Sequence, residues 1–339
     1  MAMTAANASS CAVAANDDRV VNLRLDAGVA GDGVPALQSA VEIRVPMNIV
    51  RPAIALVCLP GGGMNRRFFD LVDGDDTSFS FARAMTARGF IVVMIDHLGI
   101  GASDHPADAE MLTPDLLVSA NAKVVAQVLD SLRDGSLVAG EPALPELQSI
   151  GVGHSMGAML TVLQQAQYQQ HAALGVLGFS TRGLPEYLSP ELRELARDRV
   201  AVRAQLVELA RAMFARPPAS TPRSATQGGD FFASGKADPR GVKALRPAVD
   251  KILPIPAFLS MLPGNIADAS AQIRVPVFLG LGELDIVGPT HEVPAAFGNS
   301  HDVTLHIMPQ AGHSHFIFAA RSGLFQRFAQ WARLLANDS

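Results

Sequence analysis

Short, almost wholly apolar runs recur along this chain, and segments of helical pattern separate them. The runs are AIALVCL (53–59), GFIVVMID (89–96), SIGVG (149–153), LGVLGFS (174–180) and VPVFLGL (275–281). A strand with so few polar positions needs cover on both faces, and parallel sheets obtain that cover from helices. The helical segments begin near residues 78, 114 and 156. The alternation therefore predicts an α/β fold with a mostly parallel, doubly wound sheet and right-handed crossovers.

The two ends of the chain extend this pattern. RVVNLRL (19–25) and SAVEIRVP (39–46) alternate apolar and polar residues, so we expect two strands that each keep one face in water. HDVTLHIM (301–308) predicts a last strand, and SGLFQRFAQWARLLA (322–336) predicts a last amphipathic helix. Residues 1–18 are small and polar and lack the basic start and apolar block of an export signal, so we expect a disordered lead.

One interval, residues 181–273, interrupts the alternation, because it holds no buried-strand pattern and reads as helices. Its first part, residues 189–214, has Ser189 placed to cap a helix and Pro190 in the first turn. Its apolar residues fall on one stripe, which predicts a helix packed against the main body. We therefore expect a helical cap inserted between the sixth and seventh strands, with these boundaries: core 19–180, cap 181–273 and core 274–339.

The composition excludes several classes of partner. With 49% hydrophobic residues and a net charge of -5, the chain can bury a large core and offers no polycationic surface to nucleic acid. No apolar run approaches the roughly 20 residues that cross a bilayer. The two cysteines, Cys11 and Cys58, do not suggest a disulfide framework and favour a reducing compartment. We expect a cytoplasmic protein that acts on a small-molecule substrate, without a nucleic-acid or membrane partner, and the sequence does not indicate its oligomeric state. Basic residues in the cap interval are expected to face solvent rather than an anionic substrate: Arg223, Lys236, Arg240, Lys243 and Arg246.

The stretch GHSMG (153–157) joins an apolar strand directly to a helical pattern. Such a chain must turn within about one residue, which forces Ser155 into a strained backbone conformation and lifts its hydroxyl clear of the sheet. Gly153 and Gly157 are needed because a larger side chain would strike the neighbouring strand or helix. The pattern matches the G-x-S-x-G nucleophile elbow in the structural context that this motif requires, so Ser155 is the candidate nucleophile.

A serine needs a neighbouring base to act as a nucleophile at neutral pH. His313 follows the last predicted strand, where a doubly wound sheet delivers side chains to its carboxyl edge, and His315 is the second choice. His154 flanks the serine but would point into the structure, so a structural role is expected. By default, three further histidines are interpreted as surface or loop residues: His97, His291 and His301.

The base in turn needs a carboxylate that fixes its tautomer and stabilises the imidazolium. Glu283 and Asp285 both follow the run that ends at residue 281. We favour Asp285, because it lies three residues beyond Gly282 and can leave the strand to reach the histidine, while Glu283 stays an alternative. The order serine, acid, histidine along the chain is also the order expected for such a triad on this type of sheet.

Acyl transfer further requires donors for the developing oxyanion, each contributing on the order of 3 kcal/mol. Met156 offers its backbone N–H at the start of the helix. The second donor should come from the glycine run in LPGGGM (59–64), where either Gly62 or Gly63 can supply the N–H.

Taken together, these motifs resemble those of the α/β-hydrolase fold family, in its capped form with a serine nucleophile. The resemblance covers roughly residues 50–180 and 273–336. It depends on five motifs: PGGG (60–63), DHLGIGASD (96–104), GHSMG (153–157), GELD (282–285) and AGH (311–313). The family commonly has histidine where this chain has Pro60, which leaves the donor in the glycine loop open.

The resemblance implies hydrolysis of an ester, lactone, thioester or amide through an acyl-enzyme, without a metal or organic cofactor. Ser155 argues against the alkyl displacement performed by relatives with aspartate at the elbow. An acyltransferase or a carbon–carbon bond hydrolase would use the same three residues. A ligand-binding protein of the same fold, without catalysis, is a further alternative. The cap and the run PIPAFLSMLPG (254–264) favour an apolar substrate.

Overall fold

The computed structural model describes residues 18–29, 36–137, 142–215 and 236–337, and one eight-stranded sheet forms its centre. The strands are β1 (Arg19–Asp26), β2 (Gln38–Val45), β3 (Ile54–Leu59), β4 (Ile91–Ile95), β5 (Gln148–His154), β6 (Ala173–Leu177), β7 (Val277–Gly282) and β8 (Val303–Met308). Their order across the sheet is β1-β2-β4-β3-β5-β6-β7-β8. All neighbours from β4 to β8 are parallel, and only β2 runs antiparallel to both of its neighbours. The predicted mostly parallel α/β sheet is confirmed.

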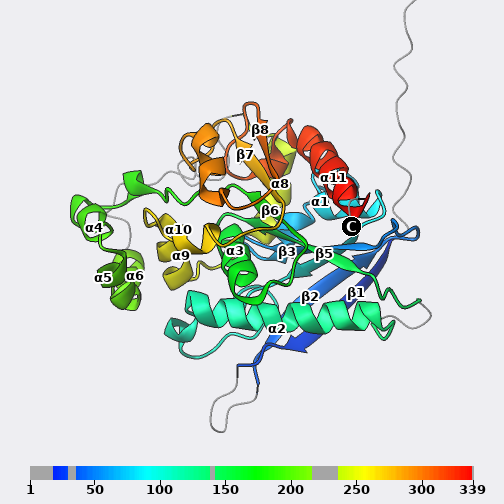
Figure 1. Ribbon diagram of the computed structural model, residues 1–339, viewed down its shortest axis with the longest axis horizontal. Helices are drawn as coiled ribbons and strands as arrows, with labels where there is room; N and C mark the ends of the chain where they lie inside the picture. Colours follow the sequence, from blue (N-terminus) through cyan, green and yellow to red (C-terminus); the bar gives the residue numbers. More distant parts are fainter. Residues whose placement is uncertain (1–17, 30–35, 138–141, 216–235, 338–339) are drawn as a thin grey trace, which may run out of the picture.

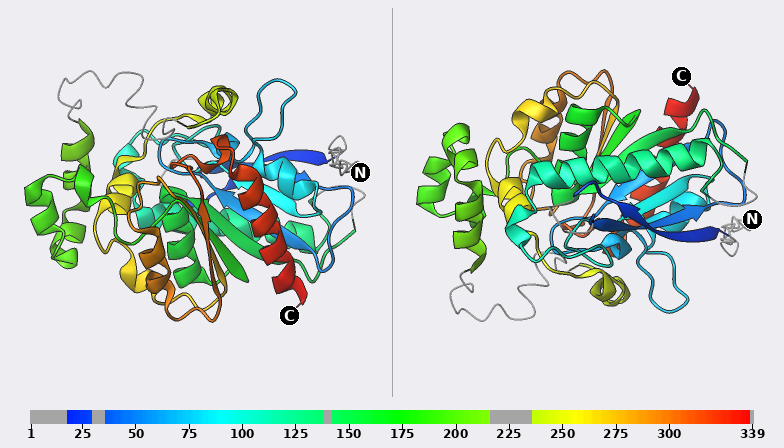
Figure 2. Two further views of the ribbon diagram at one scale, coloured as in Figure 1. Left: turned by 90° about the horizontal axis from the view of Figure 1, so that it is seen from above. Right: turned by 90° about the horizontal axis from the view of Figure 1, so that it is seen from below.

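Helices cover both faces of this sheet (Figures 1 and 2). The flanking helices are α1 (Phe81–Thr86), α2 (Pro114–Arg133), α3 (Met156–Tyr168) and α11 (Arg321–Asn337). Side chains alternate between the faces along the central strand β3. Val57 packs into the core shared with α2 and α3, whereas Leu56 packs into the core shared with α1 and α11. Two-sided burial explains why the central strands are apolar throughout.

Helix starts follow from local sequence signals. The Ser80 side chain accepts from the backbone N–H of Arg83 at the start of α1, and the Thr113 side chain accepts from the N–H of Leu116 at the start of α2. Short 3-10 turns lie between the main elements: η1 (Arg66–Phe69), η2 (Ala109–Met111), η3 (Pro185–Tyr187), η4 (Arg246–Ala248), η5 (Thr290–Phe297) and η6 (His315–Ile317).

The strand pair at the edge of the sheet differs in part from the expected pattern. β1 alternates exposed and partly buried positions. In β2, nearly all side chains on both faces are buried, so the prediction that one face of β2 lies in water is wrong. The guanidinium of Arg44, on that face, forms ion pairs with Asp18 at 3.0 Å and Asp70 at 2.7 Å. These paired charges let a polar position of the strand lie inside the protein.

Between β6 and β7 the described residues contain no strand of the sheet, and their α-helices are α4 (Pro190–Leu195), α5 (Arg199–Ala204), α6 (Leu206–Ala215), α8 (Pro239–Leu245), α9 (Pro254–Met261) and α10 (Ala267–Ser270). In Figures 1 and 2, α4, α5 and α6 lie beyond α9, at one end of the molecule. The single helix predicted over 189–214 is wrong, because three short helices replace it. The Asp198 side chain accepts from the N–H groups of Val200 and Ala201 and so starts a new helix.

Basic residues of this interval have acidic or polar neighbours. Lys243 lies 2.6 Å from Asp73, Arg240 lies 2.7 Å from Asp76, and Lys236 contacts Gln310. Arg246 is exposed, and Arg223 lies outside the described residues. These contacts fit the expectation of a solvated face.

The cysteines, the N-terminal lead and the membrane-spanning potential of the helices were also predicted from the sequence. Cys58 is fully buried on β3, and burial raises its pKa well above the ordinary value for a thiol, whereas Cys11 lies outside the described residues. Nearly all of the predicted lead, residues 1–17, is also outside them. Of the helices within the described ranges, none has the length and apolar character that crossing a membrane requires.

Candidate active site

Ser155 occupies the sharp turn between β5 and α3. Its backbone has φ 54° and ψ -122°, a left-handed conformation that non-glycine residues rarely adopt. A Cβ atom built at Gly157 would lie 2.2 Å from the carbonyl oxygen of Leu59, and one at Gly153 would lie 2.3 Å from the Cα of Ala158. Both glycines are therefore required by close backbone approach. The Ser155 side chain makes no capping bond to the helix, so its hydroxyl is available for another partner.

The structure brings Ser155, His313 and Asp285 together at the carboxyl edge of the sheet. His313 comes from the loop after β8, and Asp285 comes from the loop after β7. The Ser155 hydroxyl lies 2.9 Å from Nε2 of His313, and Nδ1 of the same ring lies 2.7 Å from Oδ1 of Asp285. Since the carboxylate accepts from Nδ1–H, Nε2 carries the lone pair that can accept the serine proton. Nucleophile, base and orienting acid are thus connected by hydrogen bonds.

Asp285 is completely buried, with 0% of its side chain exposed. Burial alone would raise the pKa of this carboxyl group, but the electrostatic effect of His313 and the hydrogen bonds from His313 and His315 hold the pKa well below its ordinary value. The backbone N–H of Ile286 also donates to Oδ1 at 2.7 Å. Asp285 is therefore ionised at neutral pH and can stabilise a positive charge on the His313 ring.

The structure also places the two alternatives named from the sequence. Glu283 is exposed and accepts hydrogen bonds from the backbone and side chain of Gln310, so it points away from His313. His315 is fully buried, and its Nε2 lies 2.7 Å from Oδ2 of Asp285. Its ring contacts the acid and not the serine, which leaves His313 as the candidate base.

His154 is buried behind the elbow. Its Nε2–H donates to the backbone carbonyl of His313 at 2.8 Å, and its ring centroid lies 4.8 Å from that of His313. Burial and the two neighbouring imidazoles of His313 and His315 lower the pKa of His154 well below its ordinary value, so the ring stays neutral. This residue therefore ties the loop of the candidate base to β5, in line with the expected structural role.

The glycine loop after β3 passes close to the elbow. A Cβ at Gly61 would lie 3.1 Å from Cβ of Ser155, and one at Gly62 would lie 3.7 Å from the Met156 sulfur. Gly63 instead faces Asp250, whose N–H donates to the Gly63 carbonyl at 2.8 Å. Among the residues that the structure describes, neither the N–H of Met156 nor that of Gly62 donates to a backbone or side-chain acceptor. Because Gly62 lies against Met156 and Gly63 lies against Asp250, Gly62 is the better candidate for the second oxyanion donor.

His97 is not a surface residue, which corrects the default interpretation from the sequence, whereas His291 and His301 are exposed as expected. Its Nε2–H donates to the carbonyl of Pro60 at 3.1 Å, and its Nδ1 accepts from the amide of Asn121 at 3.2 Å. Burial lowers its pKa, so the ring is neutral in this bonding pattern. His97 therefore anchors the first residue of the glycine loop. Its place directly after a buried strand, at the carboxyl edge, is the sequence signal that could have revealed this role.

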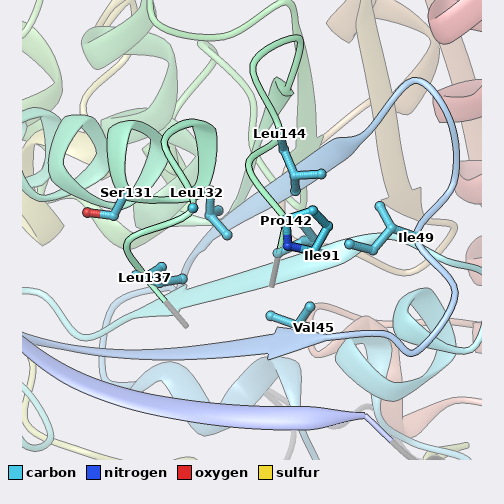
Figure 3. Close-up of a pocket in the computed structure, with 9 residues that line it drawn as sticks. Val45, Ile49, Ile91, Ser131, Leu132, Leu137, Pro142 and Leu144 are labelled. Carbon is cyan, nitrogen blue, oxygen red and sulfur yellow. The ribbon is translucent and has the colours of Figure 1, made fainter. Parts of the chain in front are cut away.

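A hollow of about 270 Å³ adjoins Ser155 and His313. Its other lining residues are mainly small or apolar: Gly178, Phe179, Ser180, Gly183, Leu184, Ser260, Ile286 and Val287. A second hollow lies at the opposite edge of the sheet, between β2, β4 and the end of α2 (Figure 3). Its lining has no titratable side chain, so it offers no group for acid–base chemistry. Within the described ranges, no three His, Cys, Asp or Glu side chains are grouped so that they could hold a metal ion.

Comparison with known proteins places this geometry in a family. The sequence model described as "Alpha/beta hydrolase family" matches residues 56–322, which is most of the chain. The chain belongs to the alpha/beta hydrolase family. No curated protein matches it.

Solved structures share the fold of this alpha/beta hydrolase at low sequence identity. Proline iminopeptidase from Mycobacterium smegmatis is 17% identical, with 95% of this chain and 99% of that chain covered and a TM-score of 0.60. A thermophilic esterase from Thermogutta terrifontis is 17% identical, with 93% and 99% covered and a TM-score of 0.56. A bromoperoxidase from Bacillus anthracis is 14% identical, with 94% and 100% covered and a TM-score of 0.56. At such identities the likeness establishes the fold, and the reaction must be argued from the site.

Proposed function

We propose that this alpha/beta hydrolase cleaves an ester-type bond of an apolar small molecule through an acyl-enzyme on Ser155. The single observation that carries the proposal is the hydrogen-bonded chain from the Ser155 hydroxyl through both nitrogens of His313 to Asp285. A serine bonded to an imidazole, which a buried carboxylate orients, is the arrangement that activates a hydroxyl for acyl transfer.

The reaction would proceed in two halves. Nε2 of His313 takes the proton of the Ser155 hydroxyl as its oxygen attacks the acyl carbon, and the imidazolium then protonates the leaving group. Water repeats the sequence and releases the acid. During each attack, the N–H groups of Met156 and Gly62 would hold the oxyanion, at the positive end of α3.

The hollow beside Ser155 supports a small, apolar acyl group. Its lining is mainly small or apolar and contains no charged residue other than the candidate base. Carboxylic esters and lactones fit this description. An acyltransferase would use the same residues with an alcohol in place of water, and analysis of products formed with a competing alcohol distinguishes the two.

The first test is covalent labelling with a fluorophosphonate probe, followed by peptide mapping. We expect one labelled position, Ser155, and loss of label together with a fall in turnover of several orders of magnitude in Ser155→Ala. The variant should keep the wild-type circular dichroism spectrum. Ser136→Ala, which changes an exposed serine after α2, is the matched control and should label normally. A folded wild-type protein that takes up no probe would favour the non-catalytic binding protein instead.

A further inference from the structure

Two imidazole rings share the carboxylate of Asp285. Oδ1 accepts from Nδ1–H of His313 at 2.7 Å, and Oδ2 accepts from Nε2–H of His315 at the same distance. The backbone N–H of Gly282 adds only a long contact to Oδ2, at 3.4 Å. His315 is therefore the main donor to the oxygen that His313 does not use.

The surroundings of His315 define its tautomer. Oδ2 of the ionised carboxylate can only accept, so Nε2 of His315 carries the proton. Among the described residues, Nδ1 of the ring has no hydrogen-bond partner, although it is buried. A second proton on Nδ1 would therefore be left without an acceptor inside the protein, which disfavours the charged ring. His315 therefore donates to Asp285 through Nε2–H.

We propose that His315 is a positioning residue that shares the charge of Asp285 and thereby lets His313 act as a base at lower pH. This inference deepens the proposed function and depends on it. With His315, both carboxylate oxygens of Asp285 accept a short hydrogen bond, and such a carboxylate attracts the proton of His313 less than one whose Oδ2 lacks that donor. The imidazolium of His313 is correspondingly less stabilised than it would be without the bond from His315.

Other titratable groups near His315 do not replace it. His154, at the end of β5, has its ring centroid 5.5 Å away in an edge-on arrangement and donates to a backbone carbonyl instead of to Asp285. His306 approaches from β8, and burial together with the nearby Arg327 and His315 lowers its pKa. Neither of these histidines has a hydrogen bond to the carboxylate of Asp285.

The test measures the rate of fluorophosphonate labelling at Ser155 against pH for wild type, three variants of His315 and one control variant. His315→Leu removes the donor, and His315→Asn retains an amide that is too short to reach Oδ2. His315→Gln places an amide N–H near the original Nε2 position but cannot ionise. His301→Gln, at an exposed loop histidine bonded to the carbonyl of Arg274, is the matched control.

We expect His315→Leu and His315→Asn to move the acid limb of the profile upward by roughly half to one pH unit. His315→Gln and His301→Gln should keep the wild-type limb. If His315→Leu does not fold, the comparison of the Asn and Gln variants is sufficient. The inference is overturned if the Asn variant keeps the wild-type limb, or if the Gln variant moves it as far as the Asn variant does. An unlabelled wild-type protein would instead remove the proposed function itself.

Proton NMR supplies a readout that does not depend on reactivity. The wild type should show two imidazole N–H resonances downfield of the amide region, from His313 and His315, because both bonds to Asp285 are short and charge-assisted. His315→Gln should lose one of them and keep the His313 resonance. A single resonance in the wild type that persists unchanged in His315→Gln would contradict the shared carboxylate.

Discussion

Ser155 shows how a single residue depends on the space that its neighbours leave. Its left-handed backbone costs about 1–3 kcal/mol, and the fold must supply compensating contacts. Close packing of the elbow against the loop after β3 supplies them, since at Gly157 the α3 backbone approaches the carbonyl oxygens of Leu59 and Pro60 with no room for a side chain. The close packing that Gly157 permits therefore compensates the backbone strain at Ser155 in the same turn.

Gly157→Ala tests this close approach. We expect a loss of about 1–3 kcal/mol in the free energy of unfolding, because the new methyl group would push the glycine loop away from α3. Labelling at Ser155 should slow as well, since that loop carries Gly62. Urea unfolding and probe kinetics measure the two effects.

The control is Gly323→Ala in α11, where an added Cβ meets no atom within 4 Å. Its free energy of unfolding should be unchanged or raised by up to about 1 kcal/mol, because alanine favours helix over glycine. Equal losses in the two variants would show that the effect at Gly157 is not specific to the elbow.

Residues that belong to a local motif were predictable from the sequence, and residues defined by distant partners were not. GHSMG combines the strand, the turn and the helix start within a few positions, so the place of Ser155 followed from pattern alone. His97 has partners 37 and 24 positions away, at Pro60 and Asn121, and the local sequence shows that it follows a buried strand but not which residues it bonds. The bond from His315 to Asp285 was missed for the same reason, since it spans 30 positions.

The position of the loop after β3 depends on hydrogen bonds from residues of two other elements. His97, directly after β4, bonds to the carbonyl of Pro60, and Asn121 on α2 orients the ring. The anchor fixes the peptide plane at the start of the glycine run, which must present the Gly62 N–H to the oxyanion. The loop is thus positioned by β4 and α2 as well as by its own strand.

His97→Leu should lower kcat by roughly tenfold or more while KM changes little, because the oxyanion forms only during reaction. The loss should stay below the roughly 100-fold or greater effect of removing a donor outright. Steady-state kinetics on a p-nitrophenyl ester measure both constants. His105→Leu, at an exposed position of the same connection, is the control and should leave kcat unchanged. A rise in KM alone would indicate that the loop binds substrate instead.

The boundaries of the helices within residues 189–214 could not be predicted from the apolar pattern. Apolar spacing over residues 189–214 predicted one helix, and the same spacing is compatible with three short helices in sequence. Asp198 decides between them, because its side chain bonds to N–H groups that a continuous helix would use internally. The prediction for β2 was wrong for a different reason. An arginine in a strand suggests a solvent-facing position, but Arg44 is paired with Asp18 and Asp70, and the sequence does not show these ion pairs.

At the scale of the whole molecule, the protein buries several histidines in the neutral state. Burial lowers the pKa of His171 to about 4, and it lowers the pKa of His97 and, much further, that of His154. In the unfolded chain these rings titrate near pH 6.5. Between about pH 4 and pH 6.5 the unfolded state therefore binds more protons than the folded state, so the free energy of unfolding rises with pH across this window.

Asp285 affects the free energy of unfolding in a different pH range from the histidines. Its pKa is lowered in the folded state, so its contribution to stability is present above the ordinary carboxyl value of 3.8 and is lost as the pH falls through the lower folded value. Histidines titrate in roughly the range between pH 4.5 and 7.5. Unfolding experiments in this range consequently report on the histidines and not on the Asp285 carboxylate.

We expect the wild-type free energy of unfolding to decrease steadily from pH 7.5 to pH 4.5, as measured with urea. His171, buried beside Ser149, should account for about 2.5 kcal/mol of the total decrease by pH 4.5, since one pKa unit corresponds to about 1.4 kcal/mol. His171→Asn cannot ionise, so its curve should be flatter, even though lost packing lowers its stability at pH 7.5. His301→Gln, at an exposed histidine, should keep the wild-type slope. Parallel curves for His171→Asn and wild type would show that the ring is not held neutral by the fold.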